Sequence, residues 1–253
     1  MKIWHCRKKQ QKISVLQVSD VLVVIPAFNE VESIGQVVDQ VAAFGFQTLV
    51  VDDGSVDQTA YVAHQCGAHV LSLPLNSGVG GALRCGFRYA VENGFTAVIQ
   101  CDADGQHLPN HLSDLVDATN RTHAHMMIGS RFGSERTTHD PSLLRRFAMQ
   151  MLSKVAQRAT KNIITDSTSG FRLIRQPLLG ELALNLPAYY LGDTFETVVV
   201  AGRAGYHVEE IGVAMAPRLH GTSSSGNFRS ILLIGKVLTT VLLGIHFRLR
   251  RLK

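Results

Sequence analysis

The sequence predicts a doubly wound α/β domain, in which helices cover both faces of a Rossmann-like, mostly parallel β-sheet. Three short, continuous runs of mainly β-branched residues fit strands that are buried on both faces. These runs cover 21–25, 48–51 and 96–99. Helical patterns lie between them, over 31–44, 58–66 and 79–92. Strands that alternate with helices in this way are typical of a parallel sheet.

The second half of the chain continues with longer elements. A polar loop at 132–141 precedes a helical stretch at 142–160. A loop rich in Ser, Thr and Gly follows at 165–172, then a helical pattern at 194–204 and an extended one at 206–214. There is no internal repeat, and 253 residues are enough for one large domain with a proper core.

Polar residues follow three of the predicted strands at the points where the strands end. They are Asn29 and Glu30 after the first, Asp52 and Asp53 after the second, and Asp102 and Asp104 after the run at 96–99. Ligands bind such sheets at the carboxyl ends of the strands, where neighbouring parallel strands finish together. We therefore expect a functional site at this edge.

The pair Asp102 and Asp104 is the clearest candidate for chemistry. Two carboxylates one residue apart repel each other unless a cation lies between or beside them. Hard oxygen ligands favour Mg²⁺ or Mn²⁺, which keep open positions for substrate phosphates. A turn built from Asp and Gly is the plainer interpretation. The acidic residues at two other strand ends favour the metal site.

A second candidate is the glycine-rich stretch NSGVGGALRCG at 76–86, which precedes and enters a predicted helix. Glycines such as Gly78 let backbone N–H groups approach a phosphate. Leu83 stands where a dinucleotide fingerprint has its third glycine, so a tight turn with close helix packing is an equal alternative.

The charge of the chain is unevenly distributed. Residues 1–12 carry five Lys/Arg and residues 211–253 carry seven, and neither segment contains an acid. The remaining 13 Lys/Arg face all 20 Asp/Glu, which gives the middle of the chain a net charge of −7. Basic ends on an acidic body suggest an anionic surface as partner. No nucleic-acid motif accompanies the charge, so nucleic acid is not the expected partner.

The C-terminal segment predicts a membrane-associated helix. Residues 230–247 are mostly apolar and RLRRLK follows, but 18 residues containing Lys236 barely match a membrane span. A helix lying at the membrane interface fits at least as well, and a helix packed on the domain is the alternative. We divide the chain into a basic extension (1–20), a catalytic domain (21–226) and this helix with its basic flank (227–253).

Six motifs together carry a resemblance to a known family. They are IPAFNE (25–30), VDDGSVDQT (51–59), LNSGVGGALRCGFRYA (75–90), CDADGQHLP (101–109), IGSRF (128–132) and TDSTSGFR (165–172). The sequence resembles a family 2 inverting glycosyltransferase of the GT-A fold. It is most similar to the polyprenyl-phosphate group, which includes enzymes like dolichol-phosphate-mannose synthase.

The resemblance implies a role for each matching residue. The nucleotide sugar would contact Pro26, Phe28, Glu30, Asp52, Asp53, Gly78, Asp102, Arg218 and Ser223. The divalent ion, Mg²⁺ or Mn²⁺, would bind to Asp102, Asp104 and Gln106. Arg131 and either Arg145 or Arg146 would receive the acceptor phosphate, and Arg172 would support the loop before it.

The resemblance also implies an activity and a location. The enzyme would move a hexose from a UDP- or GDP-linked sugar to a polyprenyl phosphate, for cell-envelope glycan or glycolipid synthesis. It would work at the cytoplasmic face of a membrane. Related enzymes often carry membrane spans after the catalytic domain, so a small separate membrane subunit is a plausible partner here.

Two alternatives stay open at this stage. A hydroxyl acceptor on a glycan or lipid would require a general base, for which Asp193 and Glu196 are the candidates. A phosphatase of the haloacid dehalogenase type also uses Asp-x-Asp-Gly. It places its nucleophile after the first strand, which here ends in PAFNE instead.

Overall fold

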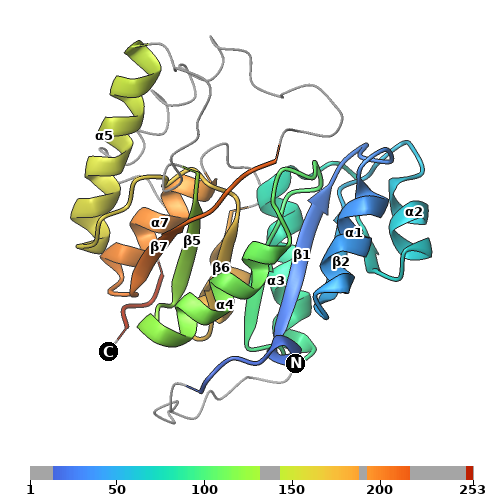
Figure 1. Cartoon of the computed structure of the whole chain (residues 1–253), viewed down its shortest axis with the longest axis horizontal. Helices are drawn as coiled ribbons and strands as arrows, with labels where there is room; N and C mark the ends of the chain where they lie inside the picture. The colour runs from blue at the N-terminus through green and yellow to red at the C-terminus, as the bar shows by residue number, and fades with distance from the viewer. Residues whose placement is uncertain (1–13, 132–142, 188–192, 217–248, 253) are drawn as a thin grey trace.

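The computed structural model describes residues 14–131, 143–187, 193–216 and 249–252. Its centre is a seven-stranded sheet of order β3-β2-β1-β4-β6-β5-β7 (Figure 1). The strands are β1 (Val21–Ala27), β2 (Gln47–Asp52), β3 (His69–Ser72), β4 (Ala97–Gln100), β5 (Met126–Ser130), β6 (Arg172–Arg175) and β7 (Val208–Gly212). Among the strands of the described ranges, only β6 runs antiparallel to its neighbours, β4 and β5. The predicted mostly parallel α/β sheet is confirmed.

Helices cover both faces of the sheet, as the sequence predicts. They are α1 (Ile34–Ala43), α2 (Thr59–Gln65), α3 (Val79–Glu92), α4 (Asn110–Thr122), α5 (Leu143–Thr160), α6 (Leu178–Asn185) and α7 (Asp193–Arg203), with a short 3-10 turn at Val18–Asp20. One core cluster joins one face of the sheet to α3, α5, α6 and α7. The other joins the opposite face to α1, α2 and α4. This arrangement explains why the strands are continuously apolar: alternate side chains point to opposite faces of the sheet, and both faces are buried.

The register of the central strands brings the polar strand ends together. β1 lies between β2 and β4 and is parallel to both, with Ala27 opposite Asp52 and Val24 opposite Gln100. All three strands therefore finish at the same edge, which is the upper edge in Figure 1. The sequence prediction of one shared acidic edge agrees with this register.

Two residue groups near the chain ends pack against the domain. Leu16 is buried, and its backbone exchanges hydrogen bonds with the side chain of Asn120 in α4 (2.8 and 3.0 Å). Leu249 joins the core cluster beside α6 and α7, and the amide of Leu252 donates to the carbonyl of Ala204 (2.9 Å). The last described residues are thus held on the edge opposite the polar strand ends.

The predicted membrane-associated helix lies largely outside the described residues, which stop at 216 and resume at 249. Within the described part of the chain, no helix combines the length and the apolar character needed to cross a membrane.

Candidate active site

Asp52 and Asp53 leave the end of β2 and brace the surrounding loops. Both are buried, at 5% and 4% exposure. Asp52 Oδ1 accepts a hydrogen bond from the amide of Ser55 (3.1 Å). Asp53 Oδ1 accepts two from Ser77, one from the amide and one from the hydroxyl (both 2.8 Å). The second carboxylate therefore ties the end of β2 to the loop that leads into α3.

The loop after β1 forms the neighbouring wall. Asn29 adopts a left-handed conformation (φ 56°), donates its amide to Ser55 Oγ and accepts from the amide of Val56 (both 2.9 Å). Phe28 is 43% exposed beside it, whereas Pro26 lies within β1 opposite Val51. The loops after β1 and β2 are therefore hydrogen-bonded to each other, and the Phe28 ring is exposed beside them.

Glu30 and Gly78, two further residues predicted to contact the nucleotide sugar, make hydrogen bonds to nearby loop residues. Glu30 donates its amide to Thr59 Oγ1 (2.9 Å) and accepts from Ser33 Oγ (3.1 Å) through its carboxylate. Gly78 caps α3 at φ 80°, and its amide donates to Asn76 Oδ1 (3.0 Å). In this structure the Gly78 amide thus stabilises the turn that starts α3.

Gly54→Ala is expected to destabilise this corner of the site by about 1–3 kcal/mol. Gly54 has φ 76°, and an added Cβ would lie 3.0 Å from backbone atoms of Leu75 and Asn76, which cannot easily move. Gly94→Ala is the matched control, because Gly94 has φ 84° with nothing within 4 Å. Urea unfolding of both variants isolates the clash from the backbone strain. Equal losses in the two would show that the loops do not meet this closely.

The loop after β4 carries the Asp-x-Asp pair in two different environments. The Asp102 side chain is 43% exposed, whereas Asp104 is buried (6%) and its Oδ1 accepts from the amide of Gln106 (3.0 Å). His107 Nδ1 accepts from the amide of Asp102 (3.1 Å), and the ring stacks on Phe171 at 4.7 Å. Burial lowers the pKa of His107 against the opposing effect of both carboxylates. A neutral ring therefore supports the turn.

The residues present fit a hard divalent ion that is shared with a substrate. In the described ranges no cluster of three or more His, Cys, Asp or Glu side chains could enclose a metal. Two adjacent carboxylates suit Mg²⁺ or Mn²⁺, which commonly take one or two protein carboxylates together with phosphate oxygens and water. The loop before β6 closes over one of them: a Cβ at Gly170 would lie 3.1 Å from both Asp102 carboxylate oxygens.

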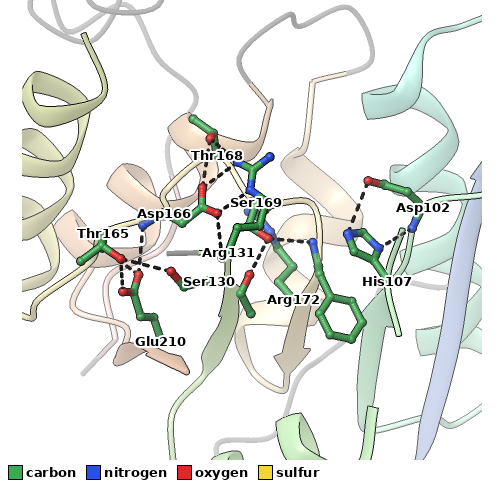
Figure 2. Close-up of polar contacts among 12 residues, drawn as sticks. Asp102, His107, Ser130, Arg131, Thr165, Asp166, Thr168, Ser169, Arg172 and Glu210 are labelled. Carbon is green, nitrogen blue, oxygen red and sulfur yellow. Dashed lines mark hydrogen bonds and ion pairs between the residues drawn. The ribbon is translucent and has the colours of Figure 1, made fainter. Parts of the chain in front are cut away.

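Arg131, directly after β5, forms an ion pair with Asp166 through two hydrogen bonds. Its Nε and Nη2 donate to the two oxygens of Asp166 (2.7 and 2.8 Å), and Nη2 also donates to Thr168 Oγ1 (3.0 Å; Figure 2). Burial raises the pKa of Asp166, but the hydrogen bonds and charge of Arg131 outweigh it and hold the pKa below its usual value. The same hydrogen bonds raise the pKa of Arg131. Asp166 therefore stays ionised and fixes the guanidinium.

The other predicted arginines differ in how far the structure places them. Arg172 begins β6, is 1% exposed, and donates to the backbone carbonyls of Ser169 and Thr194. Its guanidinium thus lies under the 165–171 loop rather than at the surface. Arg145 and Arg146 lie near the start of α5, and their side chains are outside the described part. Arg218 and Ser223 also lie outside the described residues.

Asp166, Thr168 and Glu210 belong to this site but are absent from the sequence-based candidates. The first two lie inside the TDSTSGFR motif, which by itself gives Asp166 no separate role. A signal was present, because an Asp in a loop between apolar elements needs a partner if it is buried. Glu210 lies in a β-strand with no motif around it, and nothing local marks it.

The seven-stranded, mostly parallel sheet with helices on both faces is that of the GT-A fold. Residues 22–183 match the family described as Glycosyl transferase family 2. The chain belongs to this family and is a glycosyltransferase, which removes the phosphatase alternative.

Relatives with established names refine this assignment. The chain is 31% identical to polyprenol monophosphomannose synthase of Mycolicibacterium smegmatis over 222 residues, 82% of each chain. It is also 31% identical to undecaprenyl-phosphate mannosyltransferase of Micrococcus luteus over 216 residues, 80% of this chain and 86% of the relative. The predicted resemblance to polyprenyl-phosphate sugar transferases is confirmed.

A solved structure supports the fold. Glucosyl-3-phosphoglycerate synthase of Mycobacterium tuberculosis, crystallised with Mn²⁺, UDP and glucosyl-3-phosphoglycerate, superposes with a TM-score of 0.65 at 20% identity. The match covers 95% of this chain and 86% of that one. At this identity the likeness shows the GT-A fold alone.

Proposed function

We propose that this enzyme transfers a hexose from a UDP- or GDP-linked sugar to a polyprenyl phosphate, with inversion at the transferred carbon. The proposal rests on one observation: an acidic group of side chains and a paired arginine lie close together at the same edge of the sheet. The carboxylates after β2 and β4 lie on one side, and Arg131 with Asp166 lies on the other. Gly170 joins the sides by packing against Asp102. Such an edge suits a reaction between two anionic substrates.

The donor would bind along the loops after β1 and β2. Phe28, exposed at the rim, offers a face for the nucleotide base, with Pro26 and Glu30 beside it. Asp52 and Asp53 would contact the base edge while they hold the loops. Gly78 would lie near the donor phosphates, and Arg218 and Ser223 would approach the diphosphate from the following segment.

Asp102 and Asp104, with Gln106, would hold the divalent ion beside the donor diphosphate. When bound, such an ion neutralises the charge that develops on the departing diphosphate. The buried position of Asp104 and its hydrogen bond from the Gln106 amide fix the direction of one carboxylate. The more exposed Asp102 carboxylate lies close to Gly170, in the loop before β6.

The acceptor phosphate would be received by Arg131, with Arg145 or Arg146 as a second cation. A phosphate monoester has a second pKa of about 6 and is mostly ionised near neutral pH. It therefore needs little help from a general base. Arg has five N–H donors in a planar fork, so it can contact a carboxylate and a phosphate at the same time. Glu196, a base candidate for a hydroxyl acceptor, is 1% exposed in α7.

A screen of UDP- and GDP-sugars with a short polyprenyl phosphate tests the function. We expect one donor to form a glycolipid in the presence of Mg²⁺ or Mn²⁺. The matched acceptor control is the corresponding polyprenol, which lacks the phosphate. Transfer to the alcohol and not to the phosphate would reject the proposal and favour the hydroxyl-acceptor alternative.

The segment 230–253 would bring the site to the cytoplasmic face of a membrane, where a polyprenyl chain resides. Each basic residue near an anionic surface adds about 1 kcal/mol of attraction. We expect the double variant Ile234→Asp/Leu238→Asp to reduce flotation with anionic vesicles by tenfold or more relative to the parent chain, on the order of 0.8 kcal/mol per buried CH₂. Substitution is preferable to truncation, because truncation also removes the buried Leu249. Unchanged flotation would exclude the segment as the anchor, and a small membrane subunit would then be sought.

A further inference from the structure

We propose that Glu210 is a positioning residue for the acceptor phosphate, acting through the 165–169 loop and Asp166 on Arg131. The inference rests on the proposed role of Arg131 and extends it to a residue that no motif singles out. Glu210 lies in β7, opposite Ile128 of β5 in the parallel register. β5 is the strand that ends at Ser130, directly before Arg131. Glu210 is thus on the strand next to the one that carries this arginine.

Three hydrogen-bond donors from the loop converge on the Glu210 carboxylate. The amide of Thr165 donates to Oε2 (2.7 Å), and so does the amide of Asp166 (3.1 Å). The hydroxyl of Thr165 donates to Oε1 (2.5 Å). A carboxylate has about four lone-pair sites, and hydrogen bonds to a charged acceptor are the strong ones. The carboxylate thus holds the start of the loop at two consecutive residues.

The loop passes this constraint to Arg131 through one side chain. Asp166, whose backbone amide Glu210 holds, has a side chain that is 0% exposed. This side chain accepts three hydrogen bonds from Arg131: from Nε, from Nη2 and from the backbone amide (3.2 Å). Figure 2 shows the contacts running from Glu210 through Thr165 and Asp166 to Arg131. The Asp166 carboxylate therefore holds both the backbone and the guanidinium of Arg131.

The loop also has contacts that do not involve Glu210, and Ser153 Oγ donates to the carbonyl of Ile164 directly before it (2.5 Å). Ser169 Oγ donates to the carbonyl of Gly129 (2.7 Å), which holds the far end of the loop on β5. Thr165 Oγ1 also lies 3.1 Å from Ser130 Oγ, a weaker contact between neutral groups. Loss of the Glu210 carboxylate is therefore expected to displace the loop near Asp166 without detaching it. The effect falls on the orientation of Arg131 rather than on folding.

The test compares Glu210→Ala with Glu209→Ala. Glu209 is the adjacent residue of β7. Its carboxylate pairs with His207 (2.8 Å) and accepts a hydrogen bond from Asn162 (3.4 Å), both outside the 165–169 loop. The first readout needs no substrate: the rate at which phenylglyoxal modifies Arg131, located by mass spectrometry. We expect Glu210→Ala to raise this rate by up to about tenfold, the factor that corresponds to one charge-assisted hydrogen bond. Glu209→Ala should leave it unchanged, and Glu210→Gln should give a smaller rise.

The second readout is kinetic and bears on the acceptor. Glu210→Ala should raise the KM for polyprenyl phosphate by a similar factor and leave the KM for the nucleotide sugar unchanged. Unchanged Arg131 modification in folded Glu210→Ala would overturn the inference. Should that variant not fold, the same readouts on Glu210→Gln decide the question. A faster modification in an enzyme that never uses polyprenyl phosphate would uphold the bracing of Arg131 and reject the proposed function instead.

Discussion

Asp104→Asn is expected to lower glycosyl transfer by about a thousandfold or more, since a metal ion supplies several kcal/mol of transition-state stabilisation. The change removes one negative ligand of the proposed divalent ion. Asn keeps an oxygen that can accept the Gln106 amide, so the turn after β4 should persist. Transfer rates measured with Mg²⁺ or Mn²⁺, together with ion binding by calorimetry, check this. A chelator should abolish activity of the parent enzyme, and added metal should restore it.

Asp117→Asn is the matched control for this prediction. Asp117 is an exposed residue of α4 and lies outside the acidic edge. The control should retain the activity of the parent enzyme. The free energies of unfolding of Asp117→Asn and Asp104→Asn should agree within about 1 kcal/mol. Full turnover by Asp104→Asn in the presence of a chelator would refute the metal assignment.

Arg131→Ala is expected to raise the acceptor KM or lower kcat at least about tenfold, because a hydrogen bond to a charged group contributes about 1.5–3 kcal/mol. The KM for the nucleotide sugar should not change. Arg121→Ala, at the exposed end of α4, is the matched control and should behave as the parent. A loss of nucleotide-sugar affinity with unaltered acceptor kinetics would show that Arg131 binds the donor and not the acceptor.

The same variant should lose about 1–3 kcal/mol of stability, because it leaves the buried Asp166 carboxylate without its ion pair. The partial exposure of Arg131 (37%) keeps the loss below that of a fully buried pair. The double variant Arg131→Ala/Asp166→Ala should recover part of the stability but none of the acceptor affinity. Recovery of both would mean that the pair acts only in folding.

The ion pair also predicts a dependence on pH. The pKa of Asp166 is lowered in the folded protein, so unfolded chains bind more protons as the pH falls. The stability that the pair contributes is therefore complete above the unfolded pKa of about 3.9 and is lost as the pH falls through the lower folded value. Below pH 4, the free energy of unfolding should therefore fall more steeply with decreasing pH in the parent than in the double variant.

The half of the fold that is proposed to bind the donor is readable from sequence because its signals are local. The runs at 21–25, 48–51 and 96–99 are buried on both faces, and parallel neighbours must end at one edge. Their acidic ends were predicted from these facts, and the strands β1, β2 and β4 are found where expected. The helix predicted at roughly 79–92 corresponds to α3.

The half that is proposed to bind the acceptor depends on contacts between residues far apart in the chain. β6 has only four residues, and its antiparallel place between β4 and β5 is not encoded in a periodic pattern. The pair of Arg131 with Asp166 spans 35 positions, and the contact of Glu210 with Thr165 spans 45. No propensity marks either partner, because each carboxylate is ordinary until folding buries it beside its donors.

The reversed strand β6 has a consequence for the order in which the protein is made. Strands β1 to β4 pair only with one another along residues 21–100, apart from the edge of β4 that receives β6. Because the chain is synthesised from its N-terminus, the four strands within residues 21–100 are made before any residue of the 165–171 loop. The edge of β4 must then wait, with unpaired backbone groups, for residues 172–175. During synthesis this edge is the place where a chaperone or another nascent chain would be expected to bind.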